Sequence, residues 1–376
     1  MSLEEDSQDI IYGICRFNNI GNVSCYMNSI LAVIQQTPIL IDYILTAEFK
    51  NIFIEKYKKD NEIDTAKMIE SILFQLYNIM KISHTYNNKI ITPTSFRKSL
   101  TLKDSMWGMQ QHQDSQEFLS FLLNNIEEEI AQKVIFIPGR TVDVIEKNAY
   151  NKPIFSLLNI MANNIWQQFI KKEYSIIKNL FGGMTYNNTT CEYCKNNSHN
   201  FDIFQTLQLS IPHNRTSTLD ECMEEYIKVE TVDKDNKIIC DFCGRKNKAN
   251  KQTLLWKTPK VLIIQLKRFR TNDYGIISQK ISNMVEYPIN NLDISKYIHP
   301  ESPYIDKNIY NLYAVNNHHS IGNMRTINFG HYTTMVINKY DNKWYEFDDS
   351  NELNEITDKD DIINKNAYLL FYYRCN

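Results

Sequence analysis

The residue with the most evident chemistry is Cys25, in the segment GNVSCYMNS at residues 21–29. Apolar residues follow it at the spacing of one helical face: Met27, Ile30, Leu31 and Ile34. Pro38 ends the pattern, so the spacing predicts an amphipathic helix with Cys25 in its first turn. Unpaired backbone N–H groups and the positive end of the helix dipole favour a thiolate there. The pattern indicates a nucleophile, and the alternative is a cysteine packed as a small apolar residue.

His331 and Asp348 could supply the base that such a nucleophile needs. His331 opens a strand-like segment at 332–340, and Asp348 closes the next one at 343–347. The connection between them is short, so antiparallel pairing would bring the two side chains together. We expect the carboxylate to accept the Nδ1 proton of His331, with Nε2 facing the thiol as general base and later as general acid. The alternative is an ordinary surface or core histidine.

Two CxxC pairs predict a metal site. Their thiols are Cys191 and Cys194 in the first pair, and Cys240 and Cys243 in the second. A two-residue spacer lets both thiolates of a pair reach one ion, and two pairs supply the four ligands of a closed structural zinc site. Strand-like sequence flanks both pairs, so we expect one zinc ion to join the tips of two β-hairpins. The alternative is two unrelated pairs of reduced or redox-active cysteines.

A polar segment, QQHQDSQEFL at residues 110–119, carries two further acids. Asp114 and Glu117 have the spacing of a helix N-terminal cap with a carboxylate in the first turn. A cap alone would account for this pattern. The same glutamine-rich segment before the helix, which includes Gln113, is also suited to hold a basic, extended peptide.

Helical periodicity dominates the first third of the chain, and strand periodicity the second half. Further helices are expected at 39–58, 65–82 and 115–131. Strands are expected at 201–212, 261–266 and 367–373, and the second of these is apolar on both faces, as in a buried central strand. Residues 133–170 have the pattern of an insertion. Helices first and strands later indicate an α+β architecture.

The composition limits the classes of partner and compartment. The chain has 376 residues and a formal net charge of -3, which gives no electrostatic reason to expect nucleic acid or an anionic membrane as partner. Residues 1–12 read as an acidic tail without a secretory signal, and no run has the roughly 18 apolar residues of a membrane span. Eight cysteines are too few for a disulfide scaffold, so we expect an intracellular protein, cytoplasmic or nuclear. Ordinary thiols are expected at Cys15, Cys222 and Cys375.

The sequence resembles the ubiquitin-specific protease family of deubiquitinating cysteine proteases over nearly its whole length. Eight motifs carry the resemblance in order: NIGNVSCYMNSIL, QDSQEFLSFLL, FGGMTYNNTTCEYC with DIFQTLQLSIP, the second CxxC pair, VLIIQLKRF, EYPINNLDISKY, GHYTTMVINKYDNKWYEFDDS and AYLLFYYR. One such motif would be weak, but eight in order make chance a poor explanation.

The resemblance implies a single papain-like catalytic domain over residues 1–376. Its parts would be a helical thumb at 13–180, zinc-tipped β-fingers at 181–258 and a β-sheet palm at 259–376. Cys25 would attack the carbonyl of the C-terminal glycine of ubiquitin in a thioester or isopeptide bond, and His331 would transfer the proton. Asp348 would orient His331, with Asp349 in support. Ubiquitin and ubiquitinated proteins would be the partners.

The resemblance also implies substrate contacts by motif position. Asp114 would pair with an arginine of the ubiquitin tail, and Gln113, Glu117 and Gly330 would line the cleft. Two other functions fit the same motifs. One is a ubiquitin-binding scaffold with weak catalysis, and the other is a protease for another ubiquitin-like modifier.

The cysteine motif is one residue longer than the family's usual spacing, since Val23 and Ser24 stand between Asn22 and Cys25. In the family, the side chain of the oxyanion hole lies a few residues before the cysteine. Asn19 is the best match here, with Asn18 and Asn22 as alternatives.

Overall fold

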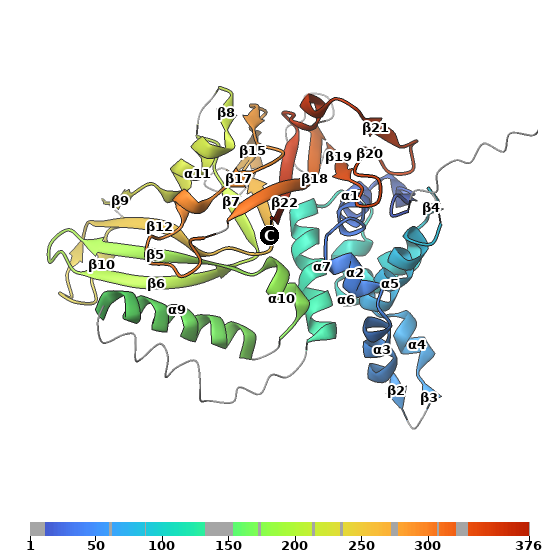
Figure 1. Cartoon of the computed structure of the whole chain (residues 1–376), viewed down its shortest axis with the longest axis horizontal. Helices are drawn as coiled ribbons and strands as arrows, with labels where there is room; N and C mark the ends of the chain where they lie inside the picture. The colour runs from blue at the N-terminus through green and yellow to red at the C-terminus, as the bar shows by residue number, and fades with distance from the viewer. Residues whose placement is uncertain are drawn as a thin grey trace, which may run out of the picture. The chain divides into compact units, whose positions relative to one another are not determined.

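The computed structural model describes residues 12–59, 62–86, 88–131, 153–171, 174–212, 215–233, 236–271, 277–306, 308–320 and 330–375. The chain divides into two compact units, and Figure 1 labels most of their elements. Unit 1 comprises residues 1–130, 269–282 and 313–369, and unit 2 comprises residues 131–268, 283–312 and 370–376. The division into thumb, fingers and palm stays a prediction.

Unit 1 begins with helices. They are α1 (Cys25–Ile34), α2 (Leu40–Ile44), α3 (Ala47–Lys56), α4 (Thr65–Ile69), α5 (Ile72–Ser83), α6 (Thr94–Lys103) and α7 (Ser115–Ile130). The predictions of one helix at 39–58 and one at 65–82 are wrong, because each range holds two helices. A capping side chain starts the second helix in each case: Thr46 Oγ1 accepts from the N–H of Phe49, and Ser71 Oγ from the N–H of Phe74.

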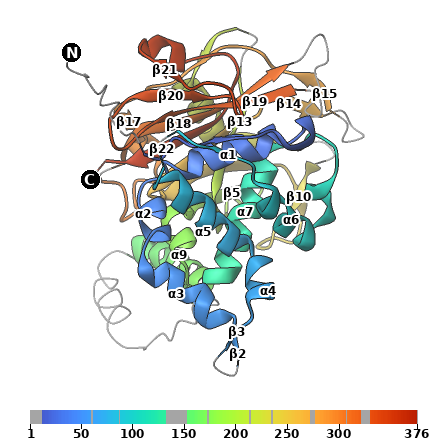
Figure 2. The same ribbon diagram turned by 90° about the vertical axis from the view of Figure 1, so that its right-hand side faces the viewer.

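Helix α1 begins at Cys25, as predicted, but it is buried on all sides rather than amphipathic. It packs against the strand β19 (Gly330–Ile337) and against α7 (Figure 2). Thr334 Oγ1 on β19 donates a hydrogen bond to the Ser29 carbonyl of α1 at 3.0 Å. A helix between a sheet and another helix needs no solvent-facing side, so the prediction of an amphipathic helix is wrong.

The sheet of unit 1 positions Asp348 relative to the start of β19. Its strands in order are β21 (Asn354–Ile356), β20 (Trp344–Phe347), β19, β18 (Ile309–Ser320) and β22 (Ala367–Arg374), of which residues 309–312 and 370–374 are assigned to unit 2. Antiparallel pairing sets Thr334 on β19 opposite Phe347 on β20. Asp348, which follows β20, therefore comes near the start of β19. Helices precede strands along the chain, which confirms the α+β class.

Unit 2 is built on a four-stranded sheet in the order β6, β5, β12 and β9. Their bounds are β5 (Gly183–Cys191), β6 (Asn197–Phe204), β9 (Glu230–Val232) and β12 (Ala249–Lys257). In the same unit, β13 (Val261–Leu266) pairs in parallel with β7 (Thr206–Leu209) and is almost entirely buried, as predicted for a central strand. The single strand predicted at 201–212 is wrong, because the chain leaves β6 after Phe204 and re-pairs as β7.

Helix α9 (Pro153–Lys171) lies within the predicted insertion and packs against β6. Its Leu158 and Ala162 enter an apolar cluster with Met184, Phe201 and Trp256 of the sheet strands. The rest of the predicted insertion, up to residue 152, lies outside the described residues. The described part of this segment thus contributes to the core of unit 2.

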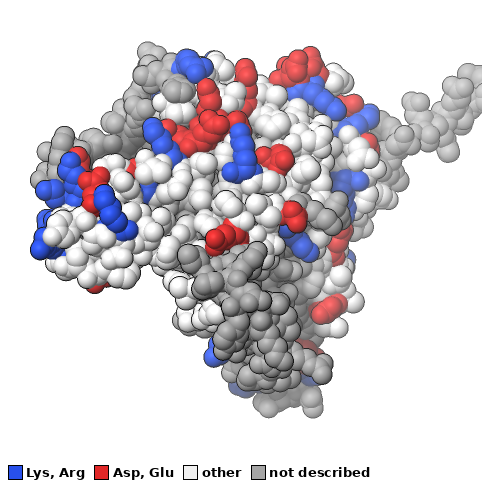
Figure 3. Space-filling model, turned by 60° about the vertical axis from the view of Figure 1, so that its left-hand side comes forward, with Lys and Arg blue, Asp and Glu red and all other residues white. Residues whose placement is uncertain are grey.

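Shorter elements complete the two units. In unit 1 they are β1 (Arg16–Phe17), β2 (Lys58–Lys59), β3 (Glu62–Ile63), β4 (Ile90–Ile91), β14 (Phe269–Thr271) and β15 (Ile277–Lys280). In unit 2 they are α10 (Ile176–Phe181), β8 (Ser217–Thr218), α11 (Leu219–Ile227), β10 (Ile238–Ile239), β11 (Lys246–Asn247), β16 (Val285–Glu286) and β17 (Leu292–Asp293). Among the described residues, no helix is both long and apolar enough to cross a membrane. Acidic and basic side chains lie interspersed on the face drawn in Figure 3.

Candidate active site

Cys25 is the first residue of α1, and its side chain is fully buried. The chain reaches it through a 3₁₀ turn, Ile20–Asn22, in which Gly21 and Asn22 have positive φ angles of 66° and 57°. Glycine and asparagine tolerate this left-handed conformation better than other residues. Cys25 thus stands at the start of the helix, with two residues between it and this turn.

The Cys25 thiol interacts with two histidines. Its Sγ lies 3.9 Å from Nδ1 of His112, and His331 and the backbone of Tyr332 lie near enough to favour the thiolate. Burial by itself raises the pKa of the thiol, but these interactions outweigh burial and lower the pKa to about 7. A large share of Cys25 is therefore a thiolate at neutral pH.

His331, near the start of β19, bonds to Asp348 through Nε2, with Oδ1 of the carboxylate as the partner. The predicted use of the two ring nitrogens is wrong: since Nε2 is engaged by Asp348, Nδ1 is the nitrogen left for the thiol. The hydrogen bond with Cys25 raises the pKa of His331 to about 9 in spite of burial, and the bond with Asp348 adds to the rise. The lowered pKa of Cys25 and the raised pKa of His331 favour a thiolate and imidazolium pair.

Asp349 bonds to the cysteine segment more closely than to the histidine. Its two carboxylate oxygens accept from the amides of Asn19 and Asn28, each at 2.8 Å. The nearer oxygen lies 4.0 Å from His331 Nε2. Burial raises the pKa of the Asp349 carboxyl, and the amide bonds oppose this rise. Asp349 thus holds two asparagines around the start of α1, and its supporting role in catalysis stays a prediction.

Asn19, predicted to serve the oxyanion hole, is bonded through both ends of its amide. Its Nδ2 donates to Asp349, and its Oδ1 accepts from the backbone N–H of Ser24 at 2.7 Å. Ser24 Oγ in turn accepts from the N–H of Ile20 at 2.7 Å. These bonds brace the turn before Cys25, and the oxyanion role of Asn19 stays a prediction.

His112 is the residue near the thiol that the sequence did not single out. It lies between the 3₁₀ turn Ser105–Gly108 and α7, inside the polar segment already noted. Its spacing does not distinguish it from the neighbouring glutamines. The hydrogen bond with Cys25 raises the pKa of His112, although burial opposes the rise. Only the folded chain brings this imidazole to the nucleophile.

Asp114 forms the cap of α7. Its Oδ1 accepts from the N–H groups of Gln116 and Glu117 at 2.7 and 2.9 Å. Its Oδ2 accepts from the hydroxyls of Tyr368 at 2.8 Å and Tyr332 at 3.3 Å. Asp114 is buried, and burial raises the pKa of its carboxyl against the effect of these bonds. Four donors already satisfy this carboxylate, so its pairing with an arginine of a substrate stays a prediction.

The other predicted substrate residues differ in exposure. Glu117 is exposed and Gln113 is half-buried, while Gly330 is buried at the start of β19. A Cβ on Gly330 would stand 2.2 Å from the His318 imidazole nitrogen Nε2. Glycine is therefore needed at this position for packing inside unit 1, whether or not it also lines a substrate channel.

The four cysteines of the CxxC pairs lie together in unit 2, at the β5 to β6 turn and at the β10 to β11 turn. Their sulfurs all lie within 4.8 Å of one another, and those of Cys194 and Cys240 are 3.6 Å apart. Zinc–sulfur bonds of about 2.3 Å in tetrahedral geometry separate the sulfurs by about 3.8 Å. The donor set and its spacing therefore fit one tetrahedral ion.

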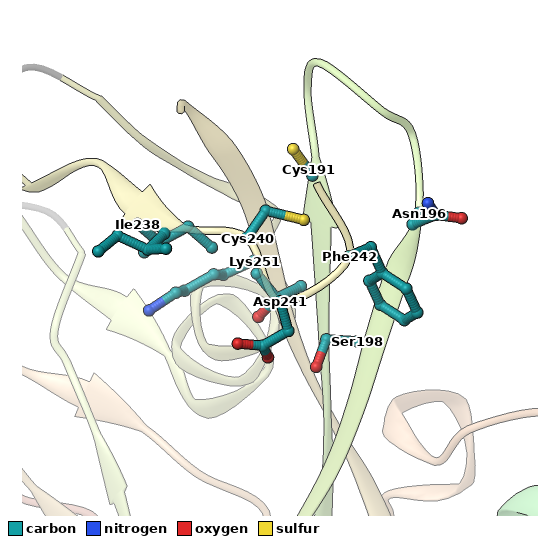
Figure 4. Close-up of a pocket in the computed structure, with 10 residues that line it drawn as sticks. Cys191, Asn196, Ser198, Ile238, Cys240, Asp241, Phe242 and Lys251 are labelled. Atoms are coloured by element: carbon teal, nitrogen blue, oxygen red, sulfur yellow. The ribbon is translucent and has the colours of Figure 1, made fainter. Parts of the chain in front are cut away.

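The two turns that carry these cysteines have the same backbone pattern. In each, the N–H four residues on donates back to the first cysteine: Lys195 to the Cys191 carbonyl at 3.0 Å, and Gly244 to the Cys240 carbonyl at 2.8 Å. Lys195 and Gly244 both have positive φ, 59° and 67°. Figure 4 shows Cys191 and Cys240 entering from the two turns beside a cleft that is also lined by Phe242. Two matching turns thus present their thiols to one point.

Comparisons with known proteins identify the family to which the chain is similar. The family model described as "Ubiquitin carboxyl-terminal hydrolase" matches residues 15–372. Ubiquitin carboxyl-terminal hydrolase Usp2 of Drosophila melanogaster is 27% identical, over 96% of this chain and 35% of the fly protein. A probable ubiquitin carboxyl-terminal hydrolase of Acanthamoeba polyphaga mimivirus is 29% identical, over 96% of this chain and 90% of the viral protein. Ubiquitin carboxyl-terminal hydrolase 2 of Bos taurus is 28% identical, and the chain spans about half of its length, 55%.

The fold itself has a counterpart among solved structures. The SAGA Ubp8/Sgf11/Sus1/Sgf73 DUB module bound to ubiquitin aldehyde contains a chain that superposes with a TM-score of 0.69 at 22% sequence identity. The match covers 98% of this chain and 71% of that one. At this level of identity, the likeness shows a shared fold.

Proposed function

The chain belongs to the ubiquitin carboxyl-terminal hydrolase family, and from that premise we propose that it is a cysteine protease that hydrolyses the bond after the C-terminal glycine of ubiquitin. One observation carries the proposal. A buried cysteine at a helix start interacts with a histidine that is itself bonded to a carboxylate, and the pKa of the thiol, about 7, lies below that of the histidine, about 9. Such a pair holds a nucleophile and a proton donor ready at neutral pH.

In the proposed mechanism, the Cys25 thiolate attacks the glycine carbonyl and forms a C–S bond, and the carbonyl electrons move onto oxygen. The tetrahedral intermediate then expels the lysine amine, which takes its proton from the His331 imidazolium. Water attacks the acyl-enzyme with His331 as base, the carboxylate leaves, and the thiolate reforms. Asp348 keeps the imidazole in one orientation and favours its charged form throughout.

A ubiquitin derivative with an electrophile at its C-terminus tests the proposal directly. We expect it to label the wild-type protein at one residue, Cys25, and to leave Cys25→Ala unlabelled. Tight binding of ubiquitin without labelling would instead make the protein a binding scaffold. Competition between ubiquitin and related modifiers for the same thiol would show whether another modifier is the preferred substrate.

Ubiquitin and ubiquitinated proteins are the proposed partners. The solved structure with the same fold is described as bound to ubiquitin aldehyde, which supports the same class of partner here. Gln113 and Glu117 remain the proposed contacts for the ubiquitin tail, because they lie beside the buried cap of α7 and keep partly or fully exposed side chains. An intracellular location is also proposed, supported by the absence of disulfides among the eight cysteines, all of which are free and described.

The rate of hydrolysis should depend on pH in a bell shape. We expect kcat/KM for a ubiquitin C-terminal amide to rise through about pH 7 as the thiolate forms, and to fall through about pH 9 as His331 loses the proton that the leaving amine needs. The two groups interact, so both midpoints belong to the pair. Initial rates across this range, with circular dichroism at each pH to control for unfolding, measure the profile. A rate that still climbs above pH 9 would contradict the assignment.

Zinc is the proposed ion of the cysteine cluster, and its role would be structural, because four sulfurs leave no open position for a substrate. Purified, reduced protein should contain about one zinc per chain. Cys191→Ser should lower this content, speed hydrogen exchange in the β5 to β6 turn and weaken ubiquitin binding, while alkylation of Cys25 stays unchanged. Cys375→Ser, a thiol of the same unit outside the cluster, is the matched control. Intact, reduced protein without metal would contradict this prediction.

A further inference from the structure

The Cys25 thiol has a second imidazole beside it that the triad does not use. His112 Nδ1 lies 3.9 Å from Sγ, while His331 is already committed to Asp348 through its other nitrogen. Asn19, which by position would serve the oxyanion, has its amide bonded to Asp349 and to Ser24. Among the described residues, a histidine from outside the triad thus lies beside the reacting sulfur.

His112 is held in place at both ends of its segment. On one side, the buried Arg97 donates to the carbonyl of Met109 at 2.8 Å and, with its other nitrogen, to the carbonyl of Ile20 at 3.3 Å. One guanidinium thereby links the turn before Cys25 to the segment before His112. On the other side, Asp114 caps α7 and accepts from the hydroxyl of Tyr332, the neighbour of His331.

The same two segments also touch directly. Gln110 packs against Gly21 so closely that a Cβ on the glycine would lie 2.2 Å from the Gln110 amide oxygen. Glycine is favoured at position 21 by its positive φ, while the exposed Gln110 side chain is free to shift. A histidine on a segment anchored in this way has the fixed position that a preorganised catalytic group requires.

We propose that His112 is a second catalytic histidine, whose Nδ1–H bonds to the resting thiolate and then to the oxyanion that forms when Cys25 attacks the carbonyl. The inference rests on the proposed function. In this step the C–S bond forms, the carbonyl electron pair moves to oxygen, and His112 donates a hydrogen bond without losing its proton. A nitrogen 3.9 Å from Sγ can lie about 2.7–3.1 Å from an oxygen on the attacked carbon, which is the range for oxyanion donors.

Two reactions of the same thiol separate the oxyanion role from thiolate stabilisation. Alkylation by iodoacetamide needs the thiolate but creates no oxyanion, whereas hydrolysis of a ubiquitin C-terminal amide needs both. For His112→Ala we expect kcat/KM for hydrolysis to fall roughly 100-fold, as for loss of one oxyanion donor, while alkylation above the thiol pKa changes less than about threefold. His112→Gln, which keeps an N–H donor but cannot titrate, should recover roughly tenfold of the loss.

Lys98→Ala, at an exposed position of α6 outside this segment, is the control and should leave both reactions unchanged. Equal losses in alkylation and hydrolysis would overturn the oxyanion role, and so would unchanged hydrolysis in His112→Ala. Thermal unfolding of each variant shows whether a loss of hydrolysis comes from misfolding. If His112→Ala is misfolded, the rates of His112→Gln test the oxyanion role instead. If the wild-type protein is alkylated but hydrolyses no ubiquitin amide, the proposed function itself is wrong. The oxyanion role of His112, which rests on that function, is then wrong as well.

Discussion

Cys25→Ala should lower kcat/KM for a ubiquitin C-terminal amide by at least about 10⁴-fold, because removing the nucleophile of a catalytic triad costs about as much as removing the whole triad. The substitution deletes only a sulfur atom from a fully buried position at a helix start, and alanine is a good helix former. We therefore expect the unfolding temperature to change little. Ubiquitin affinity, measured by calorimetry, should be kept or increased.

The control for this prediction is Cys375→Ala, which removes a thiol that lies in unit 2 and outside the cysteine cluster. It should hydrolyse ubiquitin amide at the wild-type rate. If Cys25→Ala retained more than about one hundredth of wild-type activity, another nucleophile would be acting, because triads that lose the nucleophile fall far below this level.

Asp348→Ala should lower kcat/KM by about 10² to 10³-fold. Loss of the aspartate from a buried triad costs about 10⁴, but the Asp348 side chain is 36% exposed, so water screens its charge and we expect a smaller effect. Asp348→Asn keeps an oxygen that can accept from His331 Nε2–H but lacks the charge. It should recover part of the rate, and the alkaline limb of its pH profile should move to lower pH, since Asp348 helps to raise the pKa of His331.

Asp349→Ala is the matched comparison, because the two aspartates are adjacent but bond to different partners. Its loss leaves the amides of Asn19 and Asn28 without a carboxylate acceptor, which should cost about 1–3 kcal/mol of folding free energy. Asp348→Ala should leave the unfolding temperature nearly unchanged. If Asp349→Ala were instead inactive but fully stable, Asp349 would be the catalytic aspartate and Asp348 the structural one.

The local elements of the site were predictable from short stretches of sequence. Helix α1, with Cys25 in its first turn, follows from an apolar spacing that Pro38 ends, and the four cysteines at two turns follow from the CxxC spacers. The cap of α7 at Asp114 likewise follows from an acid three residues before Glu117. In each case the partners lie within a few residues, so the spacing along the chain carries the geometry.

Errors arose where a distant partner decided the outcome. Helix α1 reads as amphipathic, but β19 and α7 cover its polar residues as well as its apolar ones. Which ring nitrogen of His331 hydrogen-bonds to Asp348 depends on the angle at which two strands present their side chains. The two split helices are a different case, because local hydrogen bonds make Thr46 and Ser71 caps that start a second helix, although both residues could have lain inside longer helices.

The sequence by itself therefore determined the family, through eight motifs in order. It also determined the α+β class, the cysteine at a helix start and the four clustered thiols, because periodicity and spacing encode contacts between near neighbours. Tertiary structure alone decided what surrounds the thiol. It placed Nδ1 of His112 at 3.9 Å from Sγ of Cys25, and it brought the Asn19 amide to the carboxylate of Asp349, to which the amide donates. His112 follows Cys25 by 87 residues, and Asp349 follows Asn19 by 330. Contacts across such separations depend on how the intervening elements pack, which no local pattern specifies.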